Sequence, residues 1–262
     1  MSNLSDRPFV LLVNDDGIYA PGLAALAQEI KKIGEVVIVA PLSEQSAVGH
    51  AITLLSPLRV SEVRKDGQFF GYGVSGTPAD CVKIAYWALL EERRPDLLIS
   101  GINHGSNTGI NVIYSGTASA ATEGTILEIP SIAVSLATYE EADFSFAAKF
   151  GRMLALKVLE KGLQPGSFLN VNVPAIPEDQ IEGVEITRQG MAMFREKFDK
   201  RTDPHNKTYY WLTGQKINLD QEPSDADDVA ILNKRISITP IQYDLTSYEL
   251  IESLRSWDLK VS

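Results

Sequence analysis

The feature that most constrains this chain is an alternation of short apolar runs with segments of helical periodicity. Most positions of each run are apolar or small, with Asn170 and Asn172 alternating along the last one, and such runs are typical of strands buried on both faces. Five runs have this character: 9–13, 36–40, 97–100, 131–135 and 168–173. Strands that alternate with helices predict βαβ units with right-handed crossovers. We therefore expect an α/β fold with a mostly parallel sheet and helices on both faces.

Helix boundary signals agree with this pattern. The segment 21–33 begins with proline, has apolar residues at helical spacing and is followed by glycine. Thr77 and Asp80 form a capping box at the start of a second helix. Asp143 is expected to cap a third helix, which Gly162 ends.

The sequence changes character after about residue 174. The segments 184–188, 207–212 and 236–241 are predicted strands within charged stretches, and 247–257 is a predicted final helix. We expect a core over residues 1–175 and a smaller β-rich C-terminal extension over 176–262. The charged run 200–207 is interpreted as a solvated loop, with a substrate lid as the alternative. An extended terminal element of this kind often docks on a neighbouring subunit.

Composition excludes several classes of protein. The chain has 24 Lys and Arg against 34 Asp and Glu, a net charge of −10, which argues against broad nucleic-acid binding and permits a small anionic ligand in one pocket. The longest apolar runs are far too short to cross a bilayer, and the first ten residues do not resemble a secretory signal. Cys81 is the only cysteine, which excludes a disulfide framework and a cysteine-based zinc site. A cytoplasmic location is expected.

Three of the predicted strands run directly into polar and glycine-rich clusters, at 14–17, 41–50 and 100–107. In an open parallel sheet, ligands bind outside the carboxyl ends of the strands, at the point where the strand order reverses. We therefore expect the three clusters to converge on one edge of the sheet.

Asp15 and Asp16 are adjacent carboxylates at the end of a buried strand, so their repulsion requires compensation. One interpretation is that one caps the following turn and the other meets solvent or a basic partner. The other is a divalent cation with hard oxygen ligands, Mg²⁺ or Mn²⁺. Asn103 and a serine of the second cluster, Ser46 or Ser43, are candidates to complete the ligand sphere. The clusters contain no Lys or Arg, which favours the metal.

The segment 114–120 places small hydroxyl residues and a glycine at the start of an alanine-rich helix. Free backbone N–H groups and the helix dipole make such a start an anion site, although a plain N-cap with close helix packing explains the pattern equally well. Asn107 and Gly105 are candidates to add donors. His50 and His104 lie in loops of the same edge and receive no chemical role.

Taken together, five blocks resemble the survival protein SurE family, whose members are metal-dependent nucleoside monophosphate phosphatases. The blocks are 13–22, 40–46, 76–82, 100–107 and 114–117, and the resemblance extends from about residue 8 to residue 137. It continues more loosely through 187–189, 209–211 and 236–240.

The resemblance implies a Rossmann-like core, a swapped C-terminal extension, and homodimers or homotetramers. It implies one divalent cation per subunit, Mg²⁺, Mn²⁺ or Co²⁺, held by Asp15, Asp16, Ser46 and Asn103. It also implies phosphate contacts from Ser43, Gly105, Asn107, Ser115, Gly116 and Thr117.

These residues predict a phosphoric monoester hydrolase. The resemblance implies that it is of the 5′- or 3′-nucleotidase type and releases phosphate from nucleoside monophosphates. Asp15 and Asp16 are the candidate catalytic residues, with Asp15 favoured as the base and water as the nucleophile. The rival hypothesis is a non-hydrolytic switch protein that binds Mg²⁺ and senses phosphate or nucleotide. Receiver domains of that kind need an aspartate at the end of the third core strand, where this chain has the segment 100–103 without one. A dinucleotide-binding oxidoreductase is disfavoured, because no G-x-G-x-x-G follows the first strand.

Overall fold

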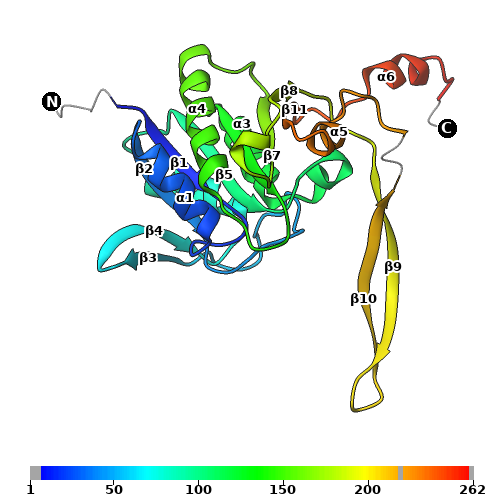
Figure 1. Cartoon of the computed structure of the whole chain (residues 1–262), viewed down its shortest axis with the longest axis horizontal. Coiled ribbons are helices and arrows are strands. Elements are labelled where there is room, and N and C mark those ends of the chain that lie inside the picture. Colours follow the sequence, from blue (N-terminus) through cyan, green and yellow to red (C-terminus); the bar gives the residue numbers. More distant parts are fainter. Residues whose placement is uncertain (1–6, 218–220, 260–262) are drawn as a thin grey trace.

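The computed structural model describes residues 7–217 and 221–259. Its centre is a nine-stranded sheet with the order β3-β4-β2-β1-β5-β6-β7-β11-β8 (Figure 1). The strands are β1 (Phe9–Val13), β2 (Glu35–Pro41), β3 (Val60–Lys65), β4 (Gln68–Val74), β5 (Leu97–His104), β6 (Ser131–Ala137), β7 (Ser167–Pro174), β8 (Val184–Ile186) and β11 (Ile236–Gln242). β4, β2, β1, β5, β6 and β7 are mutually parallel along this order, which confirms the predicted α/β class.

The order of the strands reverses direction at β1. The chain passes from β1 outward to β2, then returns to β5 on the other side of β1 and continues outward to β6 and β7. The carboxyl ends of β1 and β5 therefore form the switch point at which open α/β sheets bind ligands.

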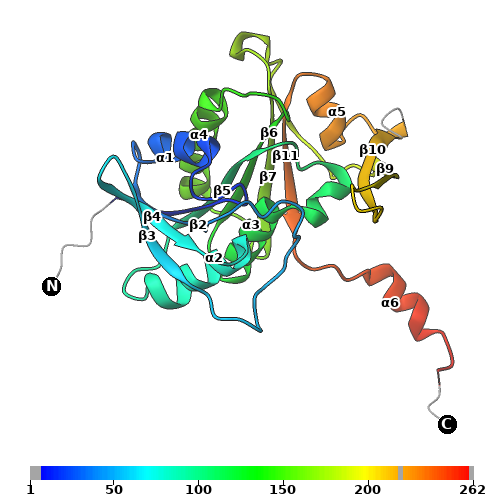
Figure 2. The ribbon, with the colours of Figure 1, turned by 90° about the horizontal axis from the view of Figure 1, so that it is seen from below.

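Helices cover both faces of the sheet (Figure 2). α1 (Pro21–Ile30) packs with α4 (Ser145–Lys161), and α2 (Pro78–Ile84) packs with α3 (Gly116–Ile126). Consecutive strand residues enter opposite layers: Leu12 belongs to the cluster with α1 and α4, whereas Leu11 belongs to the cluster with α2. Because side chains alternate across a strand, burial on both faces requires the uninterrupted apolar runs of the sequence.

The helix starts follow the sequence closely. Thr77 and Asp80 form the predicted capping box at α2, and the π-helix η1 (Ala85–Leu89) continues it. α4 begins at Ser145, whereas an N-cap at Asp143 would make Phe144 the first helical residue. The Asp143 carboxylate still accepts the N–H of Ser145, the first residue of the helix, at 2.8 Å. Gly162 ends α4 with a φ of 71°.

A hairpin at residues 60–74 escaped the sequence analysis. β3 and β4 are antiparallel and are joined at Asp66 and Gly67, which have φ values of 52° and 76°. Both residues of a type I′ turn need positive φ, and Asp-Gly is a preferred pair for it. The Asp66-Gly67 dipeptide was therefore the sequence signal that could have predicted the hairpin.

The C-terminal third differs in part from expectation. β8 and β11 extend the central sheet, with β11 antiparallel to β7. β9 (Met193–Thr202) and β10 (Thr208–Ile217) form a separate two-stranded arm that projects from the body (Figure 1). The interpretation of 200–207 as a loop was therefore wrong at its start, because Lys200 and Arg201 pair with β10.

Two helices complete the described chain. α5 (Asp227–Leu232) was not predicted, whereas α6 (Tyr248–Arg255) matches the predicted final helix, buries none of its residues and lies apart from the sheet (Figure 2). The division of the chain at residue 175 stays a prediction. Across residues 7–217 and 221–259, no helix combines the length and apolar character needed to cross a membrane.

Candidate active site

The ends of β1 and β5, the loop after β2 and the start of α3 meet at the switch point of the sheet. The Gln45 N–H donates to the Asp15 carbonyl at 2.8 Å, which ties the loop after β2 to the end of β1. The Thr117 N–H donates to Asp15 Oδ2 at 3.1 Å, and the His104 N–H donates to Asp16 Oδ2 at 3.1 Å. The predicted convergence on one sheet edge is therefore present.

Asp15 is held rigidly by the first turn of α3. Its exposed fraction is 4%, and Thr117 donates to both of its oxygens, the N–H to Oδ2 and the hydroxyl to Oδ1. Gly116 lies directly against it, since a Cβ there would be 2.7 Å from the Asp15 Cβ. Burial raises the pKa of Asp15 despite the bonds from Thr117.

Asp16 is partly buried beside the first carboxylate. Burial and then the charge of Asp15 raise the pKa of Asp16 to about 6. Neither aspartate takes part in an ion pair within the described ranges, and Glu44 adds a third nearby negative charge. The carboxylates therefore form an uncompensated negative centre, which is the electrostatic condition for holding a cation.

The other predicted cation ligands offer neutral oxygens. The Asn103 amide nitrogen donates to the Gly105 carbonyl at 2.7 Å, which leaves the amide oxygen as the end available to a cation. Ser46 is exposed in the loop after β2 and donates to Glu44 at 2.6 Å. Among the described residues, no cluster of three or more His, Cys, Asp or Glu is arranged to hold a metal, so a cation here would rest on two carboxylates with hydroxyl and amide oxygens. Such a set of oxygens fits Mg²⁺ or Mn²⁺.

Two predicted phosphate donors already have internal partners. Thr117 is bonded to Asp15, and the Asn107 amide nitrogen donates to Ser135 Oγ at 2.8 Å. The Asn107 carbonyl accepts from Asn170 and Asn172 at 2.8 and 3.1 Å, so these strand asparagines satisfy a buried carbonyl of the loop. Both groups shape the site from within.

Ser115 takes the N-cap position of α3 and accepts the Ala118 N–H at 3.0 Å, as in the plain capping interpretation. Gly105, with a φ of 121°, follows the end of β5, and Ser43 is exposed in the loop after β2. Capping leaves the hydroxyl hydrogen of Ser115 available to another acceptor.

The residues that anchor the loop after β2 were not identified from the sequence. His50 contacts Glu123 at 2.9 Å and Lys83 contacts the same carboxylate at 2.7 Å. Burial alone would raise the pKa of Glu123, but the bonds from His50 and Lys83 lower it. Asp80 accepts the Thr53 N–H at 2.9 Å. The loop that carries Ser46 is therefore fixed to both α2 and α3.

α5 supports the site from the C-terminal part of the chain. Asp227 Oδ2 accepts the Gly109 N–H at 2.9 Å, and Asp228 Oδ1 accepts the Thr108 hydroxyl at 2.6 Å. These bonds hold the loop that joins Asn107 to α3. The sequence gives no sign of this contact, because the two segments are more than 100 residues apart.

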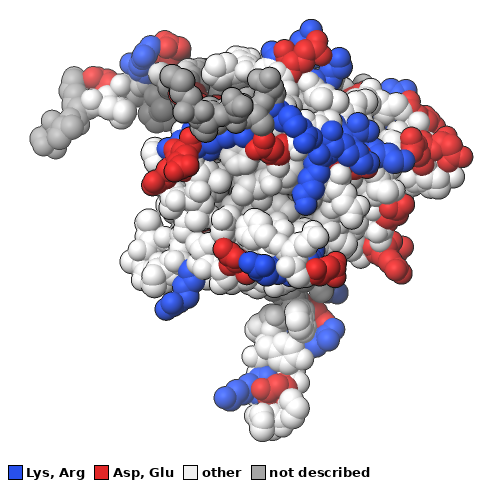
Figure 3. Space-filling view, turned by 90° about the vertical axis from the view of Figure 1, so that its left-hand side faces the viewer, with Lys and Arg blue, Asp and Glu red and all other residues white. Residues whose placement is uncertain are grey.

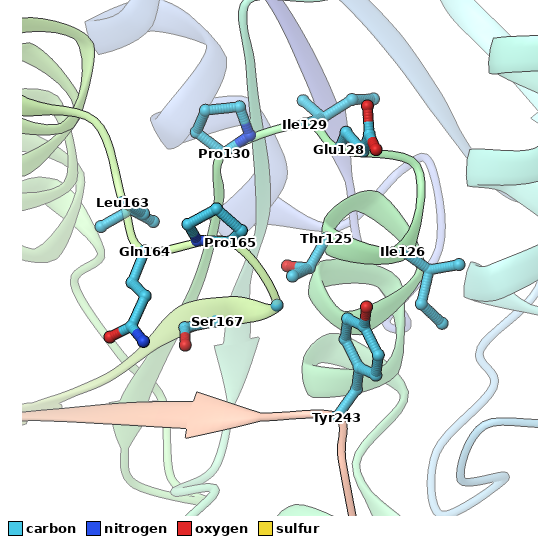
Figure 4. Close-up of a pocket in the computed structure, with 11 residues that line it drawn as sticks. Thr125, Ile126, Glu128, Ile129, Pro130, Leu163, Gln164, Pro165, Ser167 and Tyr243 are labelled. Carbon is cyan, nitrogen blue, oxygen red and sulfur yellow. The ribbon is translucent and has the colours of Figure 1, made fainter.

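A cavity of about 430 Å³ lies at the opposite edge of the sheet (Figure 4). Its walls come from the end of α3, the segments that enter β6 and β7, and Tyr243, and they include none of the predicted site residues.

On the face in Figure 3, basic and acidic side chains are interspersed, so this face is not a broad basic surface.

Comparison with known proteins agrees with the architecture. Residues 10–196 match the model of the survival protein SurE family. A protein from Syntrophus aciditrophicus (strain SB) named 5′-nucleotidase SurE is 53% identical over 246 residues, 94% of this chain and 92% of that protein. A protein of the same name from Syntrophobacter fumaroxidans (strain DSM 10017 / MPOB) is 50% identical over 250 residues, 95% of this chain and 99% of that one. The crystal structure of the SurE protein from Aquifex aeolicus aligns with a TM-score of 0.83 at 42% identity, covering 95% of this chain and 98% of that chain.

Proposed function

Because this chain belongs to the survival protein SurE family, we propose that it is a divalent-metal-dependent 5′-nucleotidase that hydrolyses nucleoside monophosphates to nucleoside and phosphate. The observation that carries the proposal is the pair Asp15 and Asp16, two adjacent carboxylates at the switch point whose charges repel and which form no ion pair in the described part of the chain. The relatives named 5′-nucleotidase SurE support the choice of substrate.

In this proposal, Asp15, Asp16, Ser46 and Asn103 hold one divalent cation per subunit, Mg²⁺, Mn²⁺ or Co²⁺. The bound cation supplies Lewis-acid polarisation of the phosphoryl group. Thr117 fixes the orientation of Asp15, since it donates to both carboxylate oxygens. A fixed carboxylate costs no reorganisation when charge develops at the reacting group.

Asp16 is a better candidate for the proton acceptor than Asp15, which the sequence analysis favoured. Thr117 donates to both oxygens of Asp15, whereas the hydrogen bond to the Asp16 side chain comes from the His104 N–H, so Asp16 keeps more lone pairs for a water proton beside the cation. A carboxylate within hydrogen-bond reach of the attacking water can act as general base. Water attacks phosphorus and its proton passes to Asp16 as the bond from phosphorus to the 5′ oxygen breaks. The 5′ oxygen takes a proton from solvent, so the nucleoside leaves as an alcohol, and Asp16 returns its proton to solvent.

The phosphate oxygens are proposed to bind at the start of α3 and the loops beside it. The candidates remain the six that the resemblance implies: Ser43, Gly105, Asn107, Ser115, Gly116 and Thr117. The dipole of this 11-residue helix favours an anion at its N-terminus, although the Thr117 and Ala118 N–H groups are already bonded to Asp15 and Ser115. Of the six, Thr117 is expected to contribute mainly by shaping the site, since its hydroxyl has an internal partner, whereas the Asn107 amide has a second N–H beside the one bonded to Ser135.

The test is release of inorganic phosphate from nucleoside monophosphates with Mg²⁺, Mn²⁺ or Co²⁺, before and after treatment with a chelator. The proposal expects turnover that the chelator abolishes and that Asp16→Asn reduces strongly. Binding of metal and nucleotide without any turnover would instead support the non-hydrolytic switch protein.

We further propose that the chain forms homodimers or homotetramers and acts in the cytoplasm, without DNA or membrane partners. Support for self-association comes from the β9–β10 arm, where Tyr210, Trp211 and Leu212 are all more than half exposed, and from α6, none of whose residues is buried by the described part of the chain. Exposed apolar clusters of this size commonly mark an interface. Light scattering at several protein concentrations tests the oligomeric state.

A further inference from the structure

An exposed aromatic ring stands beside the proposed site without a role in it. Tyr139 lies in the loop after β6 and is 78% exposed. Its ring lies directly against Gly105, because a Cβ added to that glycine would be 2.5 Å from Tyr139 Cε1 and 3.0 Å from Cζ. A side chain at position 105 would therefore displace the ring.

The ring is close to the proposed cation ligands. The Gly105 carbonyl accepts from Asn103 at 2.7 Å, and His104, between these two residues, donates its N–H to Asp16. Tyr139 thus contacts Gly105, which is hydrogen-bonded to the proposed ligand Asn103. Gly105 also follows His104, whose N–H donates to the proposed ligand Asp16.

The loop that carries the ring is anchored on both sides of it. Thr138 Oγ1 accepts the Glu140 N–H at 3.0 Å, and the His104 ring contacts the Glu140 carbonyl at 2.6 Å. The Gly105 N–H donates to the Leu136 carbonyl at 3.0 Å, which fixes the glycine against the end of β6. An aromatic ring that is exposed yet supported in this way loses little conformational freedom when it binds a partner.

From this arrangement we infer that Tyr139 is the stacking platform for the nucleobase of the substrate. This inference rests on the proposed nucleotidase function. With the phosphate at the start of α3 beside the cation ligands, the base extends away from the buried Asp15 toward the exposed ring of Tyr139. A flat base stacks on an open aromatic face through its π system, and such stacking tolerates every base.

Tyr114 and Tyr19 are also exposed near this edge, at 58% and 62%. Tyr114 immediately precedes the proposed phosphate-binding turn, and Tyr19 belongs to the turn after the acid pair. Tyr139 is distinguished from both by the contact of its ring with Gly105, one of the proposed phosphate-binding residues.

The experiment compares AMP with ribose 5-phosphate, which has the same phosphate and sugar but no base, for the wild type and for Tyr139→Ala, Tyr139→Leu and Tyr139→Phe. Loss of stacking on a base predicts that the Ala and Leu variants raise KM for AMP about tenfold, while kcat for AMP and both constants for ribose 5-phosphate stay within about twofold. The Phe variant should match the wild type, because it keeps the ring.

Tyr243→Ala is the matched control. Tyr243 is a partly exposed tyrosine that also lies near a glycine, 3.6 Å from the position of a Cβ on Gly166, but it lines the cavity at the opposite edge of the sheet. It should leave the kinetics of both substrates unchanged.

Equal effects of Tyr139→Ala on AMP and ribose 5-phosphate, or no effect on either, would overturn the inference while leaving the nucleotidase proposal intact. A wild-type protein that releases phosphate from neither substrate would remove the proposed function, and the inference with it. A changed molecular mass of the Tyr139→Ala variant in light scattering, with unchanged KM, would assign the ring to a subunit contact and also overturn the inference.

Discussion

Replacing Thr117 with valine separates the two roles that the sequence and the structure assign to this residue. The sequence predicts a phosphate donor, whereas in the structure the hydroxyl donates to Asp15 Oδ1. Valine keeps the shape of the fully buried side chain and the backbone N–H bond to Asp15 Oδ2, so only the hydroxyl bond is removed.

The magnitude follows from the kind of bond that is lost. A hydrogen bond to a charged group contributes about 1.5–3 kcal/mol, and both partners here are buried. If that energy serves to hold Asp15 in the orientation that binds the cation, affinity for the metal falls about ten- to hundredfold. The pKa of Asp15, already raised by burial, rises further when the hydroxyl is gone.

The assay is a calorimetric titration of Mn²⁺ into the metal-free wild type and variant, together with inhibition by inorganic phosphate. Thr125→Val is the matched control, since Thr125 is a buried threonine of the same helix whose hydroxyl donates to the Ala121 carbonyl at 2.9 Å. The control should bind Mn²⁺ like the wild type. Unchanged affinity for Mn²⁺ in Thr117→Val, with inhibition by phosphate about tenfold weaker, would refute the positioning role.

Three further perturbations test the same site. Gly116→Ala should lower affinity for Mn²⁺ and the rate of hydrolysis at least about tenfold, although alanine is the better helix former, because its Cβ would lie 2.7 Å from the Cβ of Asp15; normal activity in this variant would contradict the close contact. The pKa of Asp16 is raised to about 6, so between about pH 4 and pH 6 the metal-free folded state binds more protons than the unfolded chain. The metal-free protein therefore loses stability as the pH rises through that window. A cation removes this penalty, so the rise in Tm on adding Mn²⁺ should be larger at about pH 7.5 than at about pH 5, and calorimetry showing the opposite order would exclude the acid pair as the metal site. His50→Ala should lower affinity for Mn²⁺ about three- to tenfold, because it frees the loop that carries the proposed ligand Ser46 from Glu123; an unchanged affinity would mean that the other anchors of the loop suffice.

Local patterns in the sequence were sufficient for the parts of the fold that depend on neighbouring residues. Largely apolar runs predicted the five parallel strands β1, β2, β5, β6 and β7, because burial on both faces favours apolar residues at consecutive positions. The buried Asn170 and Asn172 of β7 are exceptions, since both donate to the Asn107 carbonyl. The capping box at Thr77 depends on residues three apart and was confirmed. The same logic predicted that the polar clusters after these strands would meet, since parallel strands end at a common edge.

The C-terminal strands depended on contacts that local patterns do not encode. β9 has a charged, exposed surface in place of an apolar run, so it resembles a loop in sequence, and only its pairing with β10 makes it a strand. β11 joins the central sheet by pairing with β7, and β8 joins it by pairing with β11. In both pairs the partners lie far apart in sequence. The residue composition of these segments is compatible with either a separate sheet or an extension of the central one.

At the site, the sequence determined which chemical groups are present, and the tertiary structure decided which group each of them faces. Asp15, Asn107 and Thr117 were all identified from the chain, but their hydrogen-bond partners are 28 to 102 residues distant. A donor bound to a buried carboxylate is no longer available to a ligand, since each N–H or O–H serves one strong acceptor. The assignment of Thr117 to Asp15 therefore follows from packing α3 onto the end of β1, which residue types and local spacing leave undetermined.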